Sequence, residues 1–79
     1  MAKAYVLLKV IPGHERNIVK ELKDISDIQE IDELYGEWDM IAKISVEKLE
    51  DLDALLSNKI RKIGGVTLTS TMIVAEYRY

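Results

Sequence analysis

Two short stretches of the chain concentrate side chains that could take part in ligand chemistry. The first is the tetrapeptide 36–39, Gly-Glu-Trp-Asp, in which an aromatic ring and two carboxylates follow a glycine. The second is the hydroxyl-rich run 67–71, Thr-Leu-Thr-Ser-Thr. An ordinary hairpin turn requires only residues such as Asn, Asp or Gly. The tetrapeptide therefore carries more chemistry than a reversal of the chain requires.

The chemistry that these two stretches could support together is the binding of a free amino acid. Such a ligand needs a carboxylate for its ammonium group and several neutral donors for its own carboxylate. Asp39 or Glu37 could supply the carboxylate. The neutral donors could be backbone N–H groups around Gly36 together with four hydroxyls, those of Thr67, Thr69, Ser70 and Thr71. The alternative is purely structural: threonines are ordinary strand residues, and Trp38 covers the core or an oligomer contact.

The composition gives little support for a catalytic or metal-binding site. The chain has one histidine and no cysteine, so nucleophilic triads, thiolate or histidine-rich metal sites and disulfides are not expected. We interpret His14 as a solvated residue in the first turn of a helix. Acidic residues gather between 27 and 33 without the ligand spacing of a calcium loop. We therefore predict no catalytic residue, no metal and no cofactor.

Charge and length restrict the class of partner and compartment. Eleven Lys and Arg against fourteen Asp and Glu give a net charge of -3, and the basic residues are scattered. Because phosphate contacts supply most nucleic-acid affinity, we do not expect direct binding to DNA or RNA. No apolar run is long enough for a membrane span and no signal-peptide pattern opens the chain, so we predict no membrane association and a cytoplasmic location. The 79 residues predict one small domain.

The first half of the chain reads as a strand, a helix and a second strand. Residues 2–10 are rich in β-forming residues with one fully apolar face, and Pro12-Gly13 ends them. From His14 the apolar residues recur at spacings of three and four through Ile25, which predicts an amphipathic helix. A strand is predicted over 28–35, where imperfect alternation indicates a bulge or a partly exposed edge.

The second half reads as a strand, a helix and a final strand. Residues 40–46 are expected to form a hairpin with 28–35 around the turn at 36–39. A helix is predicted from about 46 to 63, with Ser45 or Glu47 at its start and Gly64-Gly65 at its end. Its apolar face is expected to carry Leu49, Leu52, Leu55, Leu56, Ile60 and Ile63. Residues 66–79 are expected to form one long strand, in which the threonines at 67, 69 and 71 share a face with Ile73.

This order predicts an α+β, ferredoxin-like βαββαβ fold. Each helix has one apolar stripe, so both should cover the same face of a four-stranded antiparallel sheet. The other face would stay bare, and it would carry Tyr, Leu, Ile and Val in addition to Thr and Lys. Because a bare apolar sheet face usually marks an interface, we predict a homodimer formed sheet to sheet.

The element order, the central Gly36-x-x-Asp39 and the closing Gly65-Val66-x-x-Thr69-x-Thr71 resemble the ligand-sensing RAM domain of the Lrp/AsnC regulators. RAM stands for regulation of amino acid metabolism. The resemblance covers essentially the whole chain. It implies a dimeric α+β barrel whose dimers join into rings, commonly octamers.

The resemblance also implies where an effector would bind. In the family, amino-acid effectors mostly bind between dimers. Carried over by position, the site would take Gly36, Trp38 and Asp39 from one side and Thr69 and Thr71 from the other. Glu37 and Ser70 occupy variable positions between them, and Trp38 would either shape the pocket or fill it.

Full regulators of this family carry a helix-turn-helix domain before this region, whereas here the first predicted strand begins at Ala2. We therefore predict a single domain over 1–79 without a DNA-binding part: a stand-alone amino-acid sensor that assembles with itself or with full-length regulators. The sequence also permits two alternatives. One is a small dimeric α+β barrel enzyme of the monooxygenase type, which rests on architecture alone. The other is a structural oligomerisation module without a ligand.

Overall fold

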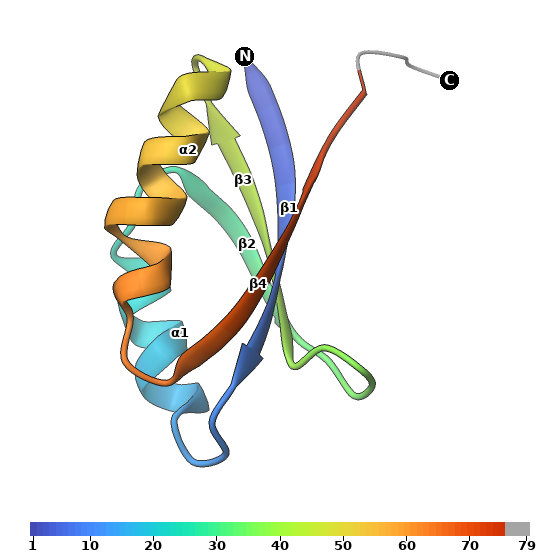
Figure 1. The fold of residues 1–79 in the computed structure, drawn as a ribbon, viewed down its shortest axis with the longest axis vertical. Coiled ribbons are helices and arrows are strands. Elements are labelled where there is room, and N and C mark those ends of the chain that lie inside the picture. Colours follow the sequence, from blue (N-terminus) through green and yellow to red (C-terminus); the bar gives the residue numbers. More distant parts are fainter. Residues whose placement is uncertain (76–79) are drawn as a thin grey trace.

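The computed structural model describes residues 1–75, and these form the predicted βαββαβ fold (Figure 1). The elements are β1 (Ala2–Val10), α1 (Glu15–Lys23), β2 (Ile28–Glu33), β3 (Met40–Val46), α2 (Leu49–Asn58), the 3-10 turn η1 (Ile60–Lys62) and β4 (Val66–Ile73). The strands form one antiparallel sheet in the order β2-β3-β1-β4. Both helices lie on one face of it, so the fold prediction is confirmed.

The core lies between that face and the two helices. Strand β1 has neighbours on both sides and alternates strictly, so that every second side chain from Ala4 to Val10 is buried. Burying a large apolar side chain contributes roughly 1.5–3 kcal/mol. The other buried apolar side chains come mainly from β3, α1 and α2 and include Met40, Ile44, Ile18, Leu22, Leu52, Leu55 and Leu56.

The second strand is shorter than predicted. It ends at Glu33 instead of residue 35, and residues 34–39 form a loop in which Tyr35 is fully exposed. The predicted irregularity is confirmed, because the β2–β3 register shifts between Ile28 and Glu30. A bulge of this kind lets a strand bend while its apolar residues keep facing the core.

The second helix is also shorter than predicted. It begins at Leu49 instead of residue 46, because β3 continues to Val46, which pairs with Ala2 at the far end of β1. Neither Ser45 nor Glu47 caps it: the Asp51 carboxylate accepts a hydrogen bond from the Lys48 N–H at 3.2 Å. Leu49 is 55% exposed, so its predicted place on the apolar face is wrong.

The last strand is described only in part. It runs to Ile73, and the Val74 N–H still donates to the Lys3 carbonyl at 2.9 Å. Residues 76–79 of the predicted strand lie outside the described part of the chain.

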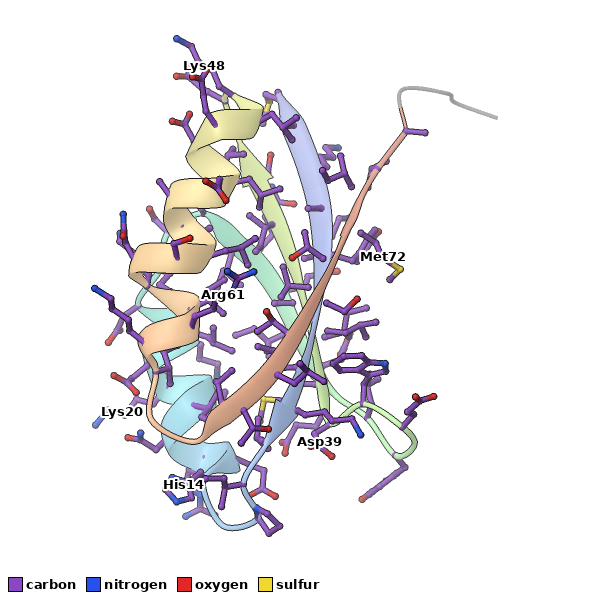
Figure 2. The ribbon with its side chains drawn as sticks, viewed as in Figure 1. His14, Lys20, Asp39, Lys48, Arg61 and Met72 are labelled. Carbon is purple, nitrogen blue, oxygen red and sulfur yellow. The ribbon has the colours of Figure 1, made fainter. Side chains whose placement is uncertain are left out.

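The sheet face away from the helices is bare in a single chain. We call it the open face; it carries Tyr5 and Leu7 from β1, Ile41 from β3 and Leu68 and Met72 from β4, as the register requires. Leu68 and Met72 are about half exposed, at 53% and 49%. Figure 2 shows Met72 directed away from the helices. Within residues 1–75, no helix is long and apolar enough to cross a membrane.

The turn before β4 packs against the start of α1. Gly65 has a φ of +100°, and its carbonyl accepts a hydrogen bond from the Ile11 N–H at 2.8 Å. A Cβ at this position would lie 2.6 Å from the Cβ of His14. Gly65 thus combines a left-handed backbone with a close approach, whereas a Cβ at Gly64 would meet no described atom within 4 Å.

These two adjacent glycines provide a matched test of the packing. We expect Gly65→Ala to lower the free energy of unfolding by about 1–3 kcal/mol, because it strains the backbone and displaces His14. Gly64→Ala should change it by less than about 0.5 kcal/mol. Urea unfolding at one protein concentration measures both, and His14→Ala should recover little of the Gly65→Ala loss, because alanine keeps the Cβ that lies 2.6 Å away. Equal stability of the two glycine variants would contradict this packing.

Candidate functional site

The Gly-x-x-Asp tetrapeptide lies in the β2–β3 loop, residues 34–39, near the ends of the sheet where β1 stops and β4 starts. The Leu34 N–H donates to the Asp39 carbonyl at 2.8 Å and closes the loop. The loop then projects to the side of the sheet away from the helices (Figure 1). Gly36 and Glu37 are exposed within it.

Asp39 joins this loop to the end of β1. Its N–H donates to the Leu8 carbonyl at 2.9 Å, and its Oδ2 accepts a hydrogen bond from the Val10 N–H at 2.8 Å. The β1–β3 register ends at the pair Leu8–Met40, so the carboxylate takes the place of the next backbone acceptor. At least one oxygen of Asp39 is therefore engaged inside its own chain.

Trp38 lies over the open face and not in the core. The Lys9 Nζ is 5.9 Å from the centroid of the indole ring. Lys9 pairs with Leu68 on β4 and belongs to the open face. The indole is partly exposed, and the contact is near the outer limit of a cation–π interaction.

The hydroxyl side chains of β4 do not share one face. Thr69 and Thr71 lie opposite Leu8 and Val6, which are buried beneath the helices, so both threonines are on the helix side of the sheet. The expectation that threonines line the bare face is therefore wrong for these two. Ser70 lies opposite Leu7 and is on the open face.

Within a single chain, the predicted site residues therefore lie in two separate places. Strand β1 lies between β3 and β4, and adjacent strands are about 4.8 Å apart, so β3, where the 36–39 loop ends, is roughly 10 Å from β4 across the sheet. In addition, Trp38 lies over one face, whereas Thr69 and Thr71 lie on the other. The two groups of residues do not form one pocket within a subunit.

A cavity of about 300 Å³ lies instead beside the start of β4. The described residues that line it are Arg61, Val66, Thr67, Leu68 and Thr69. The Arg61 Nε donates to the Thr69 Oγ1 at 3.4 Å, and Figure 2 shows Arg61 directed from the helical layer toward the strands. The Thr67 hydroxyl donates to the Lys9 carbonyl at 3.2 Å. We call this space the β4 cavity.

The backbone adds a further donor at the β4 cavity. Strand β4 is an outer strand of the described sheet. The Val74 N–H points toward β1, and backbone groups alternate in direction along a strand, so the N–H and C=O groups of Thr71 and Thr69 point away from the sheet. Among residues 1–75, a guanidinium, a hydroxyl and an N–H without a strand partner therefore gather at one place.

Arg61 was missed in the sequence because it also suits the last turn of a helix, where a cation complements the helix dipole. Its spacing carries a usable signal: Thr69 follows eight positions after it, with a Gly-Gly reversal between them. A residue so placed can fold back over the strand that follows. Two further cavities, of about 380 and 370 Å³, contain none of the predicted site residues.

Comparison with known proteins gives a consistent assignment. Residues 3–77 match the family described as the Lrp/AsnC ligand binding domain. The HTH-type transcriptional regulator FL11 of Pyrococcus abyssi is 37% identical over 73 residues, which cover 92% of this chain and 48% of that protein. The chain thus spans about half the length of the curated relatives that it matches.

Two solved structures have nearly the same extent as this chain. One is FFRP-DM1, which is 36% identical with a TM-score of 0.91; the match covers 95% of this chain and all of that one. The other is the hypothetical protein PHS023 from Pyrococcus horikoshii, 35% identical with a TM-score of 0.90, where the match covers 98% of this chain and 93% of that one.

The role of Asp39 in holding the loop can be tested by substitution. Asp39→Ala leaves the partly buried Val10 N–H without a partner, which should lower the free energy of unfolding by about 1–3 kcal/mol. Asp39→Asn keeps an acceptor oxygen and should lose less than half of that. Amide hydrogen exchange at Val10 should accelerate in the alanine variant.

The control is Glu37→Ala, which removes an exposed carboxylate from the same loop and should change stability by less than about 0.5 kcal/mol. All variants need the same protein concentration, because self-association shifts apparent stability. Unchanged Val10 exchange in Asp39→Ala would show that the carboxylate does not hold the loop.

Proposed function

The chain belongs to the Lrp/AsnC ligand-binding domain family, and on that premise we propose that it is an independent amino-acid-sensing and assembly module. In this proposal it dimerises through the open face, and the dimers join into a ring. An amino acid binds between dimers and changes either the assembly of the chain itself or that of a full-length regulator. The observation that carries the proposal is the division of the predicted site residues between two places on one subunit.

The open face supports the dimer. Its apolar side chains come from three neighbouring strands, β3, β1 and β4, and large exposed apolar patches mark interaction sites. The β2 edge of this face carries Glu30 and Asp32, while lysines 3, 9 and 43 lie on β1 and β3. A two-fold interface is self-complementary, so acids and lysines of one face can meet their opposites on a second copy.

The position of the loop supports a site that is shared between dimers. Residues 35–37 are exposed and extend away from the helices of their own chain. The β4 cavity opens beside an unpaired strand edge, where another chain can approach. Two half-sites that cannot meet within one subunit can meet when the loop of one dimer reaches the β4 edge of another.

A shared site would couple ligand binding to assembly. A ligand shifts an equilibrium only by its differential affinity for the two states, and such coupling is typically ~1–3 kcal/mol per site. Because a ring repeats the junction, the contributions of its sites act together. The rival proposal is a module that assembles without a ligand, which predicts self-association that no amino acid alters.

The sensing proposal is tested by titrating the chain with each of the twenty amino acids in a calorimeter while light scattering follows its mass. We expect at least one amino acid to release or absorb heat and to shift the midpoint of assembly by roughly 5–150-fold in concentration. If assembly occurs and no amino acid changes heat or mass, the ligand-free module is correct and the sensor is not.

The dimer interface has its own test. We expect Met72→Lys to weaken self-association by at least about tenfold, because it places an unpaired charge within the open face. The matched control is Ser57→Lys, which adds the same charge on the exposed surface of α2. Sedimentation velocity over a concentration series measures both. Equal association of the two variants would place the dimer interface elsewhere.

A further inference from the structure

We propose that Arg61 in the β4 cavity binds the carboxylate of the ligand, and that the ammonium group of the ligand is bound separately by Glu37 of a neighbouring copy. This inference deepens the function proposed above and rests on it for the identity of the ligand as an amino acid. It assigns each charged end of the ligand to a different subunit.

The charge of the β4 cavity supports the first half. Among the described residues that line it there is one cation, Arg61, and no acid. The guanidinium has five N–H donors in a planar fork that matches the two oxygens of a carboxylate. Among the described residues it makes one side-chain hydrogen bond, to the Thr69 hydroxyl, which is long at 3.4 Å. Most of its hydrogen-bonding capacity therefore remains for a ligand.

The edge of β4 adds neutral donors beside that cation. The Thr69 N–H points out of the sheet, and the Thr69 hydroxyl already lies at the guanidinium. A carboxylate placed against Arg61 can accept from the guanidinium, from this N–H and from this hydroxyl together. Charge-assisted hydrogen bonds of this kind are about twice as strong as neutral ones. A volume of about 300 Å³ suits a ligand the size of an amino acid.

The assignment of the ammonium group to Glu37 depends on which acid of the 34–39 loop is free to bind a ligand. The Asp39 Oδ2 already accepts from Val10, and this bond holds the loop to β1. Glu37, the other acid of the loop, is exposed and lies beside the loop tip. The β4 cavity offers an ammonium group outward backbone carbonyls but no acid among its described lining residues, so in our proposal the charged partner for that group comes from outside the subunit. The exposed loop of another copy brings such an acid.

The two contacts are separable by ligand chemistry. A 2-oxo acid keeps the carboxylate and lacks the ammonium group, whereas an amino-acid amide keeps the ammonium group and lacks the carboxylate. If Arg61 holds the carboxylate, its removal should weaken binding of the amino acid and the 2-oxo acid and leave the amide unaffected. Removal of the Glu37 charge should weaken binding of the amino acid and the amide and leave the 2-oxo acid unaffected.

The experiment is calorimetric titration of the assembled protein with the amino acid that binds most tightly in the screen, its amide and its 2-oxo acid. We expect Arg61→Gln to weaken the amino acid and the 2-oxo acid by about 10–100-fold, as loss of hydrogen bonds to a charged group implies. Thr69→Val should weaken the same two ligands by a smaller factor. Glu37→Gln should show the opposite selectivity.

The matched control is Lys62→Gln, which removes one positive charge from the same 3-10 turn outside the lining of the β4 cavity and should change every affinity by less than about twofold. Circular dichroism and urea unfolding establish that each variant is folded. If Arg61→Gln does not fold, Arg61→Lys takes its place; it keeps the charge, loses the planar fork and should weaken carboxylate binding to an intermediate degree.

The possible outcomes separate this inference from the proposed function. If wild-type protein binds an amino acid and Arg61→Gln binds it equally well, or loses the amide to the same extent, the carboxylate assignment is overturned and the sensor stands. If no amino acid binds but the 2-oxo acids do, and Arg61→Gln loses them, the carboxylate site stands and the amino-acid sensor is overturned. Silence toward every carboxylate overturns both.

Discussion

The hydrogen bond from the Val10 N–H to the Asp39 carboxylate determines how the end of the sheet that carries the 34–39 loop is built. It closes the β1–β3 ladder with a side chain where the backbone of β3 no longer reaches. Because Asp39 is held there, residues 34–38 leave the sheet on the side away from the helices, and Trp38 lies over Lys9. The same bond occupies a carboxylate that looked available for a ligand. One short contact thus sets the direction of the loop and decides which of its acids remains free.

The two-residue period of β4 has an equally direct effect. Register with β1 turns Thr69 and Thr71 to the helix side and turns Leu68, Ser70 and Met72 to the open face. A shift of one residue would exchange the two sets and place the hydroxyls in the proposed dimer interface. The observed register keeps the polar positions at an accessible edge, beside Arg61, and leaves the open face mainly apolar. The surfaces for assembly and for ligand binding can therefore be distinct although they share a strand.

The sequence predicts the features that depend on local pattern, and it does so well for β1, the apolar stripe of α1, the bulge of β2 and the element order. The sequence-based prediction fails where pairing between strands that are distant in the sequence determines the structure. Helix α2 starts late because Val46 pairs with Ala2, and no local signal near residue 46 reports the far end of β1. The motif residues 36–39 and 69–71 stood out by type, but their faces depend on register. Arg61 was passed over because a helix terminus already explained it, and only the fold places it at Thr69.

The open edge of β4 also affects how the chain behaves at high concentration. A strand with unpaired N–H and C=O groups is a template for continued sheet growth, and soluble proteins usually protect such edges with charge or proline. Residues 66–73 contain neither, since they read Val-Thr-Leu-Thr-Ser-Thr-Met-Ile. The guanidinium of Arg61, held over this edge from the preceding turn, is a charged group at the place where a foreign strand would add. The side chain that we assign to ligand binding would then also oppose amyloid-like stacking of strands on β4. It would do so even when no ligand is bound in the β4 cavity, because the charge stays at the strand edge.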